Sequence, residues 1–213
     1  MKSKKDVKEI IKILKETYPE AECSLDFSNP FQMAVAVLLS AQCTDARVNI
    51  VTKELFKAGP TAEKMNELTV KEIEKYIALC GLYKTKAKNI KGLAEMVMDK
   101  YNGEIPDTME ELMKLPGIGR KSANVVMLEA FHNPQGVAID THAKRICNRI
   151  GISKEESPEK IEKDLLKKID KDEYFDANHL CVWHGRYTCK ARKPECERCT
   201  ITKYCNYFKI KNI

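Results

Sequence analysis

Apolar side chains recur every three or four positions along most of the chain, which is the spacing of amphipathic helices. Glycine and proline interrupt this pattern at intervals and predict turns there. No run of alternating apolar and polar residues is flanked by turns, so no strand is expected. The helices predicted from this pattern cover residues 5–17, 46–57, 70–80, 84–101, 107–114, 120–131, 141–150, 158–168 and 173–184.

One further helix, predicted within residues 28–42, is apolar on nearly every side. Ser28 and Asn29 are candidate caps for it, and Pro30 falls in its first turn. A helix that is apolar all round is normally buried in a core. The chain is therefore predicted to be all-α, and the break at residues 132–136 is the best candidate for a boundary between domains.

Composition and charge limit the number of domains, the cellular location and the partners that can be expected. A chain of 213 residues can form one large domain or two modest ones, each with its own core. Its longest apolar run is far shorter than the roughly 20 residues that span a bilayer. The N-terminus lacks the apolar segment of a secretion signal, so we expect a cytoplasmic protein outside the membrane. The net charge of +6 favours polyanionic partners such as nucleic acid, although only weakly.

Four of the nine cysteines crowd together near the C-terminus and call for a specific explanation. They are Cys189, Cys196, Cys199 and Cys205. Four thiolates this close in sequence can surround a soft metal centre, and the spacing alone fits zinc and a [4Fe–4S] cluster about equally well. The residues between them include Lys190, Arg192 and Lys193, which favour a phosphate-binding surface over a merely solvated face.

The segment "LPGIGRK" at residues 115–121 predicts a tight turn between two short helices. After Pro116, both Gly117 and Gly119 can take a positive φ and allow another chain to approach closely. The N-terminus of the second helix offers unpaired N–H groups to an anion. A glycine pair alone is a weak signal, but between two helices in a basic protein it indicates a helix–hairpin–helix.

Lys121 follows Arg120 at the start of that second helix, and two roles are open to it. On residue type alone, an electrostatic role is favoured. A crowded lysine can instead lose its proton and attack a carbon atom as a neutral amine. Asp140, in "VAIDTHAKRI", is the candidate carboxylate partner. It is also well suited to cap the helix that follows, and the two roles are compatible.

Four segments together resemble endonuclease III, a family of bifunctional DNA glycosylases in the helix–hairpin–helix superfamily. They are "LLSAQCTDARVN", "LPGIGRKSANVV", "VAIDTHAKRICNR" and "HGRYTCKARKPECERCTITKYC". The resemblance runs from about Ile10 to the last cysteine. It implies two helical domains with a DNA-binding cleft between them. Residues 23–133 would form a six-helix domain with the hairpin, and residues 1–22 plus 134–213 the domain with a C-terminal [4Fe–4S] cluster loop.

The resemblance also implies a reaction. A damaged nucleotide would be flipped out of the duplex, and Lys121 would attack its C1′ and expel the base. Asp140 would assist, a Schiff base would form, and β-elimination would cut the strand 3′ to the lesion. The partners would be double-stranded DNA with oxidised or ring-saturated pyrimidines, or with abasic sites. The protein would act as a monomer associated with the nucleoid, and the cluster, held by the four cysteines, would be chiefly structural.

The same resemblance assigns residues that contact DNA. Gln42 would fill the space left by the flipped base, and Leu82 would wedge into the stack. Without the resemblance, Gln42 would be interpreted as an exposed amide at a helix end and Leu82 as a core anchor. His142 is interpreted as an exposed histidine at a helix start. The DNA backbone would be contacted by Pro116, Gly117, Gly119, Arg120, Lys190, Arg192 and Lys193.

Other functions are less well supported by the sequence. The related adenine-mismatch glycosylases place a glutamate in the early buried helix, where this chain has Ala36 and no carboxylate. A non-catalytic DNA-binding module would not need Lys121 paired with Asp140. A metal-dependent nuclease would need grouped acidic ligands, and no convincing set lies beside the hairpin. Cys43 stands where the family pattern favours a smaller residue, and the sequence does not assign it a role.

Overall fold

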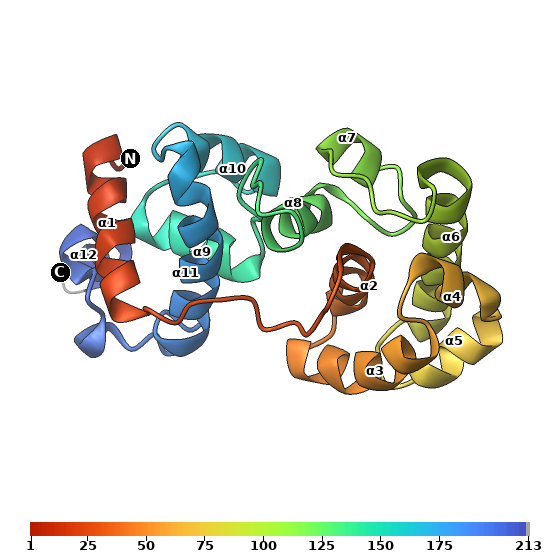
Figure 1. Ribbon diagram of the computed structural model, residues 1–213. Coiled ribbons are helices and arrows are strands. Elements are labelled where there is room, and N and C mark those ends of the chain that lie inside the picture. The colour runs from red at the N-terminus through yellow and green to blue at the C-terminus, as the bar shows by residue number, and fades with distance from the viewer. Residues whose placement is uncertain (212–213) are drawn as a thin grey trace. The chain divides into compact units, whose positions relative to one another are not determined.

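The computed structural model describes residues 1–211, and within that range every regular element is a helix. The all-α prediction is therefore confirmed. The chain divides into two compact units (Figure 1), one formed by Ser24–Asn133 and the other by Met1–Cys23 together with Pro134–Ile213. None of the helices in the described range is both long enough and apolar enough to span a membrane.

The Ser24–Asn133 unit is built around the apolar helix predicted within residues 28–42. That helix, α2, spans Pro30–Ser40, and its residues from Phe31 to Leu39 are all buried. Asn29 caps it, because the Asn29 side chain accepts a hydrogen bond from the main-chain N–H of Gln32 at 2.9 Å. The helices α3, α6 and α8 pack against α2. The unit also contains α3 (Asp45–Ala58), α4 (Ala62–Glu67), α5 (Val70–Tyr76), α6 (Tyr83–Tyr101), α7 (Met109–Leu112) and α8 (Arg120–Glu129).

Several helix boundaries in this unit differ from the sequence-based expectation. Helix α5 ends at Tyr76 rather than at residue 80, and Leu82 starts α6 from a left-handed conformation. Helix α4 was not expected at all. It is only six residues long, with Ala62 and Met65 as its buried positions, so its apolar pattern is too short to be recognised.

The second unit joins the N-terminal helix to the C-terminal half of the chain. Helix α1 (Lys4–Thr17) packs on α11, α11 packs on α9, and α9 also contacts α10 and α12. Val7 and Leu14 of α1 share one apolar core with Ile146 and Leu180. The remaining helices are α9 (Thr141–Ile150), α10 (Pro158–Leu166), α11 (Tyr174–Tyr187) and α12 (Asn206–Lys211), and the 3-10 turns are η1 (Lys171–Glu173), η2 (Cys196–Arg198) and η3 (Thr202–Tyr204).

The helix expected at 173–184 begins as η1 and continues as α11 to Tyr187. The short elements η2, η3 and α12 were not predicted. The segment that carries η2 and η3 has no helical apolar repeat, because its cysteines face a common pocket instead of a helix core.

Candidate metal centre and nucleic-acid interface

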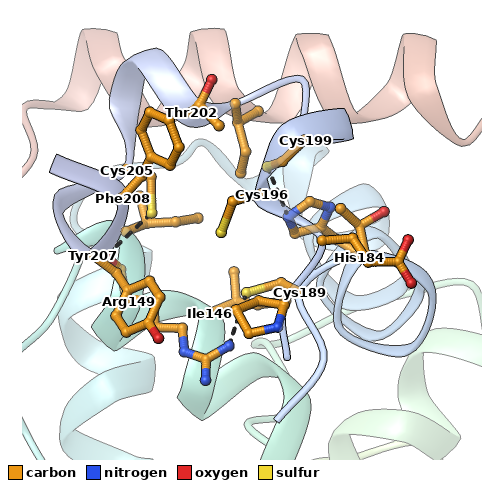
Figure 2. Close-up of a pocket in the computed structure, with 15 residues that line it drawn as sticks. Ile146, Arg149, His184, Cys189, Cys196, Cys199, Thr202, Cys205, Tyr207 and Phe208 are labelled. Carbon is orange, nitrogen blue, oxygen red and sulfur yellow. Dashed lines mark hydrogen bonds between the residues drawn. The ribbon is translucent and has the colours of Figure 1, made fainter. Parts of the chain in front are cut away.

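The four crowded cysteines line one pocket (Figure 2). Cys189 follows α11, Cys196 begins η2, Cys199 follows η2, and Cys205 follows η3. The rest of the lining is largely apolar and includes Ile146, Ile150, Ile201, Tyr207 and Phe208. The fold therefore gathers the four thiols predicted to be ligands around a single pocket.

Two side chains outside the predicted set place nitrogen atoms beside these sulfur atoms. The Arg149 guanidinium donates to Cys189 Sγ at 3.4 Å, and His184 Nε2 lies 3.7 Å from Cys199 Sγ. Sulfur accepts hydrogen bonds well only as a thiolate, so such donors suit a set of metal-bound thiolates.

His184 is held as a neutral ring. Burial, and then the nearby Arg145 charge, lowers the pKa of His184 to about 4. The hydroxyl of Tyr18 lies 3.1 Å from His184 Nδ1 and 2.7 Å from Thr188 Oγ1. In the tautomer in which Nδ1 accepts from Tyr18, the ring proton lies on Nε2, toward Cys199.

Four thiols that line one pocket can serve as the ligands of either metal centre that the spacing left open, a zinc ion or an iron–sulfur cluster.

The basic residues of the cysteine loop differ in their surroundings. All three of Lys190, Arg192 and Lys193 are exposed, and Lys190 forms an ion pair with Glu195 at 2.5 Å. The Arg149 guanidinium donates to the carbonyl oxygens of Lys190 and Ala191 at 2.8 and 2.9 Å, which fixes this part of the loop to α9. Arg192 and Lys193 therefore extend from a backbone that is anchored beside the pocket.

The hairpin residues lie between α7 and α8, as expected, but the two glycines differ. Gly117 has φ +79°, and a Cβ there would lie 2.8 Å from Leu38 Cδ1. Gly119 is the N-cap of α8 with φ −99°, so the positive φ expected for it is wrong. A Cβ on Gly119 would meet nothing within 4 Å. Gly117 is thus required by the fold, while Gly119 leaves open space at the start of α8.

Arg120 and Lys121 are exposed in the first turn of α8, where no side chain caps the helix. Asp140 belongs to the other unit and is the N-cap of α9, because its Oδ1 accepts from Ala143 N at 2.7 Å. The expected capping role of Asp140 is confirmed. Its half-buried carboxylate follows the buried residues Val137–Ile139.

Gln42 and Leu82 lie on neighbouring turns of the Ser24–Asn133 unit. Both residues are exposed, and both have the left-handed backbone that is uncommon outside glycine, with φ +53° and +58°. Leu82 is 61% exposed, so its interpretation as a core anchor is wrong. The turns approach closely, since a Cβ on Gly81 would lie 3.6 Å from the Gln42 carbonyl oxygen.

Cys43, which the sequence left without a role, lies at the contact between these turns. Its Sγ is 3.7 Å from the Sγ of Cys80, and Cys80 is buried. His142 is half-buried instead of exposed, with its Nδ1 3.1 Å from the Arg145 guanidinium. The contact of Cys43 was not visible in the sequence, because Cys80 lies 37 positions away, whereas Arg145 lies one helical turn after His142.

Lys86, Arg149 and His184 were all missed by sequence reasoning. For Lys86 a signal existed, because it lies one turn before Ile90 on the apolar face of α6, where a lysine is unexpected. For Arg149 and His184 no local signal existed, since their sulfur partners are about 15 to 40 positions away along the chain.

Comparison with known proteins agrees with this geometry. Residues 35–171 match the family of HhH-GPD superfamily base excision DNA repair proteins, and residues 189–205 match the iron–sulfur binding domain of endonuclease III. The chain is 45% identical to endonuclease III of a Synechocystis strain, over 96% of this chain and 94% of that protein. It is 43% identical to endonuclease III of Escherichia coli K12, over 93% and 94% of the two chains.

Solved structures give the same result. A structure of a trapped endonuclease III–DNA covalent intermediate superposes with a TM-score of 0.94 at 42% identity and covers all of both chains. The chain therefore belongs to the endonuclease III family and is a base-excision repair enzyme, a DNA glycosylase with abasic-site lyase activity that carries a [4Fe–4S] cluster and acts on double-stranded DNA.

Proposed function

We propose that this enzyme removes oxidised or ring-saturated pyrimidines from duplex DNA through a Schiff base on Lys121, and then cuts 3′ to the abasic site. The observation that carries this proposal is the position of Lys121. Its amine is exposed in the first turn of α8, directly after a glycine hairpin, at a helix end without a side-chain cap.

The hairpin would bind the DNA backbone. The uncapped N–H groups at the start of α8 have the partial positive charge that binds phosphate. Gly119 leaves room for a phosphate to reach them, Gly117 fixes the turn against Leu38 of α2, and Pro116 lies beside Gly92 of α6. Arg120 adds a cation beside the phosphate. Binding of the phosphate by the hairpin would bring the sugar of an adjacent flipped nucleotide within reach of Lys121.

The chemistry then has two parts. The neutral amine of Lys121 attacks C1′, and the C1′–N bond to the base breaks as the base leaves. Asp140 takes a proton from the lysine ammonium and stabilises positive charge on the sugar. Opening of the sugar ring gives an imine, loss of a proton from C2′ breaks the C3′–O bond, and water finally releases Lys121. The relative whose solved structure is described as a trapped covalent intermediate with DNA supports a covalent step here.

Gln42 and Leu82 would enter the duplex around the flipped nucleotide. Their exposed side chains on adjacent turns suit this role, since one can replace the missing base and the other can separate the stack. Lys190, Arg192 and Lys193 would contact phosphates farther along the DNA. Cys189, Cys196, Cys199 and Cys205 would hold the [4Fe–4S] cluster, which orders the loop that carries these cations.

The proposal is tested with duplex DNA that contains one thymine glycol. The wild-type enzyme is expected to release the base and cut the strand, whereas Lys121→Ala binds the duplex but does neither. Arg120→Ala serves as a matched control, because it removes a neighbouring cation: binding weakens, but the covalent step remains. Equal base release by Lys121→Ala and the wild type would show that Lys121 is not the nucleophile.

A further inference from the structure

Lys86 is a buried cation that lies away from Lys121 in the chain and has no part in the chemistry proposed above. It is only 4% exposed, and its Nζ donates to the carbonyl oxygens of Leu39 at 2.9 Å and Ala41 at 2.6 Å. Both carbonyls belong to the C-terminal end of α2, where the helix dipole is negative. A buried ammonium is costly unless such acceptors surround it, so this lysine requires a specific explanation.

Lys86 also fixes the turn that contains Leu82. The main-chain N–H of Lys86 donates to the Leu82 carbonyl at 3.0 Å and closes the first turn of α6. Lys86 therefore binds Leu82 through its backbone and Ala41, the residue before Gln42, through its side chain. One residue joins the two exposed side chains that are proposed to enter the duplex.

The two turns are in direct contact as well as joined through Lys86. The Gln42 carbonyl lies next to Gly81, and the sulfur atoms of Cys43 and Cys80 are 3.7 Å apart. Gln42 and Leu82 both hold left-handed conformations, which persist in non-glycine residues only where their surroundings fix them.

We propose that Lys86 is a positioning residue that holds the Gln42 turn and the Leu82 turn together as one rigid probe of duplex DNA. The inference rests on the proposed role of Gln42 and Leu82. A rigid probe avoids the loss of conformational freedom that two loose turns would suffer when they enter the stack. Lys86 is consequently needed when the duplex must be opened and is dispensable when the target nucleotide is already unpaired.

The link that Lys86 forms between the two turns, called the tether below, is tested without DNA through the native thiols of Cys43 and Cys80. Dibromobimane becomes fluorescent once both of its bromides are displaced, so it reports whether Cys43 and Cys80 can be bridged. Lys86→Met keeps the aliphatic stem but removes the donors, and bridging is expected to slow by roughly tenfold, in keeping with the loss of a charged hydrogen bond. Lys88→Met, an exposed lysine on the same helix, is the matched control and bridges at the wild-type rate. Cys43→Ser gives the background.

The functional consequence is measured as abasic-site cleavage in duplex and in single-stranded DNA. For Lys86→Met, we expect the duplex rate to fall by roughly tenfold while the single-strand rate stays at the wild-type value. Should this variant not fold, as judged by circular dichroism, Lys86→Gln takes its place, because its shorter, neutral side chain loses the charged hydrogen bonds to both carbonyls and the same losses are expected. Unchanged thiol bridging, or equal losses on both DNA forms, would overturn the tether.

Gln42→Ala and Leu82→Ala separate this inference from the function on which it rests. If they lose duplex cleavage and Lys86→Met does not, the two probe residues keep their role and the tether is wrong. If they retain full duplex cleavage, the role of Gln42 and Leu82 in opening DNA is wrong, and with it the function of the tether. Slowed thiol bridging in Lys86→Met would still establish Lys86 as the structural link between the turns.

Discussion

Gly117 and Gly119 stand two residues apart in one turn and serve different needs. Gly117 provides a positive φ and lets Leu38 of α2 approach, whereas Gly119 provides open space where α8 begins. The sequence motif predicted the turn, but it could not distinguish the two glycines. That difference depends on α2, which is about 80 residues away in the chain.

Alanine at each position should separate stability from DNA binding. Gly117→Ala is expected to lower the free energy of unfolding by about 1–3 kcal/mol, because the new methyl group is strained and meets Leu38. Gly119→Ala should change it by no more than about 0.5 kcal/mol. Its methyl group instead occupies the space needed by a phosphate, so affinity for abasic duplex falls. Urea unfolding and DNA titration measure the two effects, and a reversal between the variants would contradict these assignments.

Asp140 combines a cap with a proposed catalytic carboxylate, and two substitutions separate them. Asp140→Asn retains an acceptor for Ala143 N, so stability should remain near the wild-type value while turnover falls by roughly 100-fold. Asp140→Ala should lose turnover and about 1 kcal/mol of stability. Single-turnover kinetics and thermal unfolding give the two quantities. Wild-type turnover in Asp140→Asn would leave capping as its only role.

At the scale of elements, the apolar repeat was sufficient for the long helices but missed two of the short ones, α4 and α12. The entirely apolar run became the buried helix α2, and the repeat at residues 84–101 became α6. Helices of about six residues, such as α4 and α12, carry too few buried positions to establish a period. The contacts of Lys86 and Cys43 were beyond prediction, because they depend on how α2 and α6 pack together.

Asp170 links η1 to α1 and gives the fold a testable dependence on pH. The hydrogen bonds from Lys4, and then from Lys8, lower the pKa of the Asp170 carboxyl to about 2. The folded pKa lies below the unfolded value of about 3.9, so the stabilisation is complete above that value and is lost as the pH falls toward 2. Asp170→Asn should therefore be less stable than wild type at neutral pH and nearly equal near pH ~2. Thermal unfolding across this range, at low salt, measures the difference, and a difference independent of pH would rule out this contribution.

At the scale of the molecule, the cysteine loop depends on the metal centre more than on helical packing. Cys199→Ala should remove the visible absorption of the cluster, lower the melting temperature and weaken DNA binding, because Arg192 and Lys193 lose an ordered backbone. Cys23→Ala, which changes a cysteine outside the pocket, serves as the control and should retain the absorption. Full DNA affinity in a Cys199→Ala protein without absorption would show that the loop does not need the cluster.

The sequence could indicate the family, because the hairpin and the cysteine loop are local motifs, and it could indicate the cofactor only through that resemblance, since the cysteine spacing alone fits zinc equally well. It could not identify the environment of the thiols, since the donors Arg149 and His184 come from α9 and α11. Without the family resemblance it also could not predict that Leu82 is exposed, because an apolar residue in a helical repeat is ordinarily expected to be buried.

The central claim is that the amine of Lys121 forms the covalent bond to DNA. Borohydride reduction during the reaction with abasic duplex should link protein and DNA, and peptide mapping by mass spectrometry locates the bond. The account predicts a single adduct, on the peptide that contains Lys121, and no adduct with Lys121→Ala. An adduct on another lysine or on the N-terminal amine of the wild-type protein, or undiminished trapping by Lys121→Ala, would contradict it.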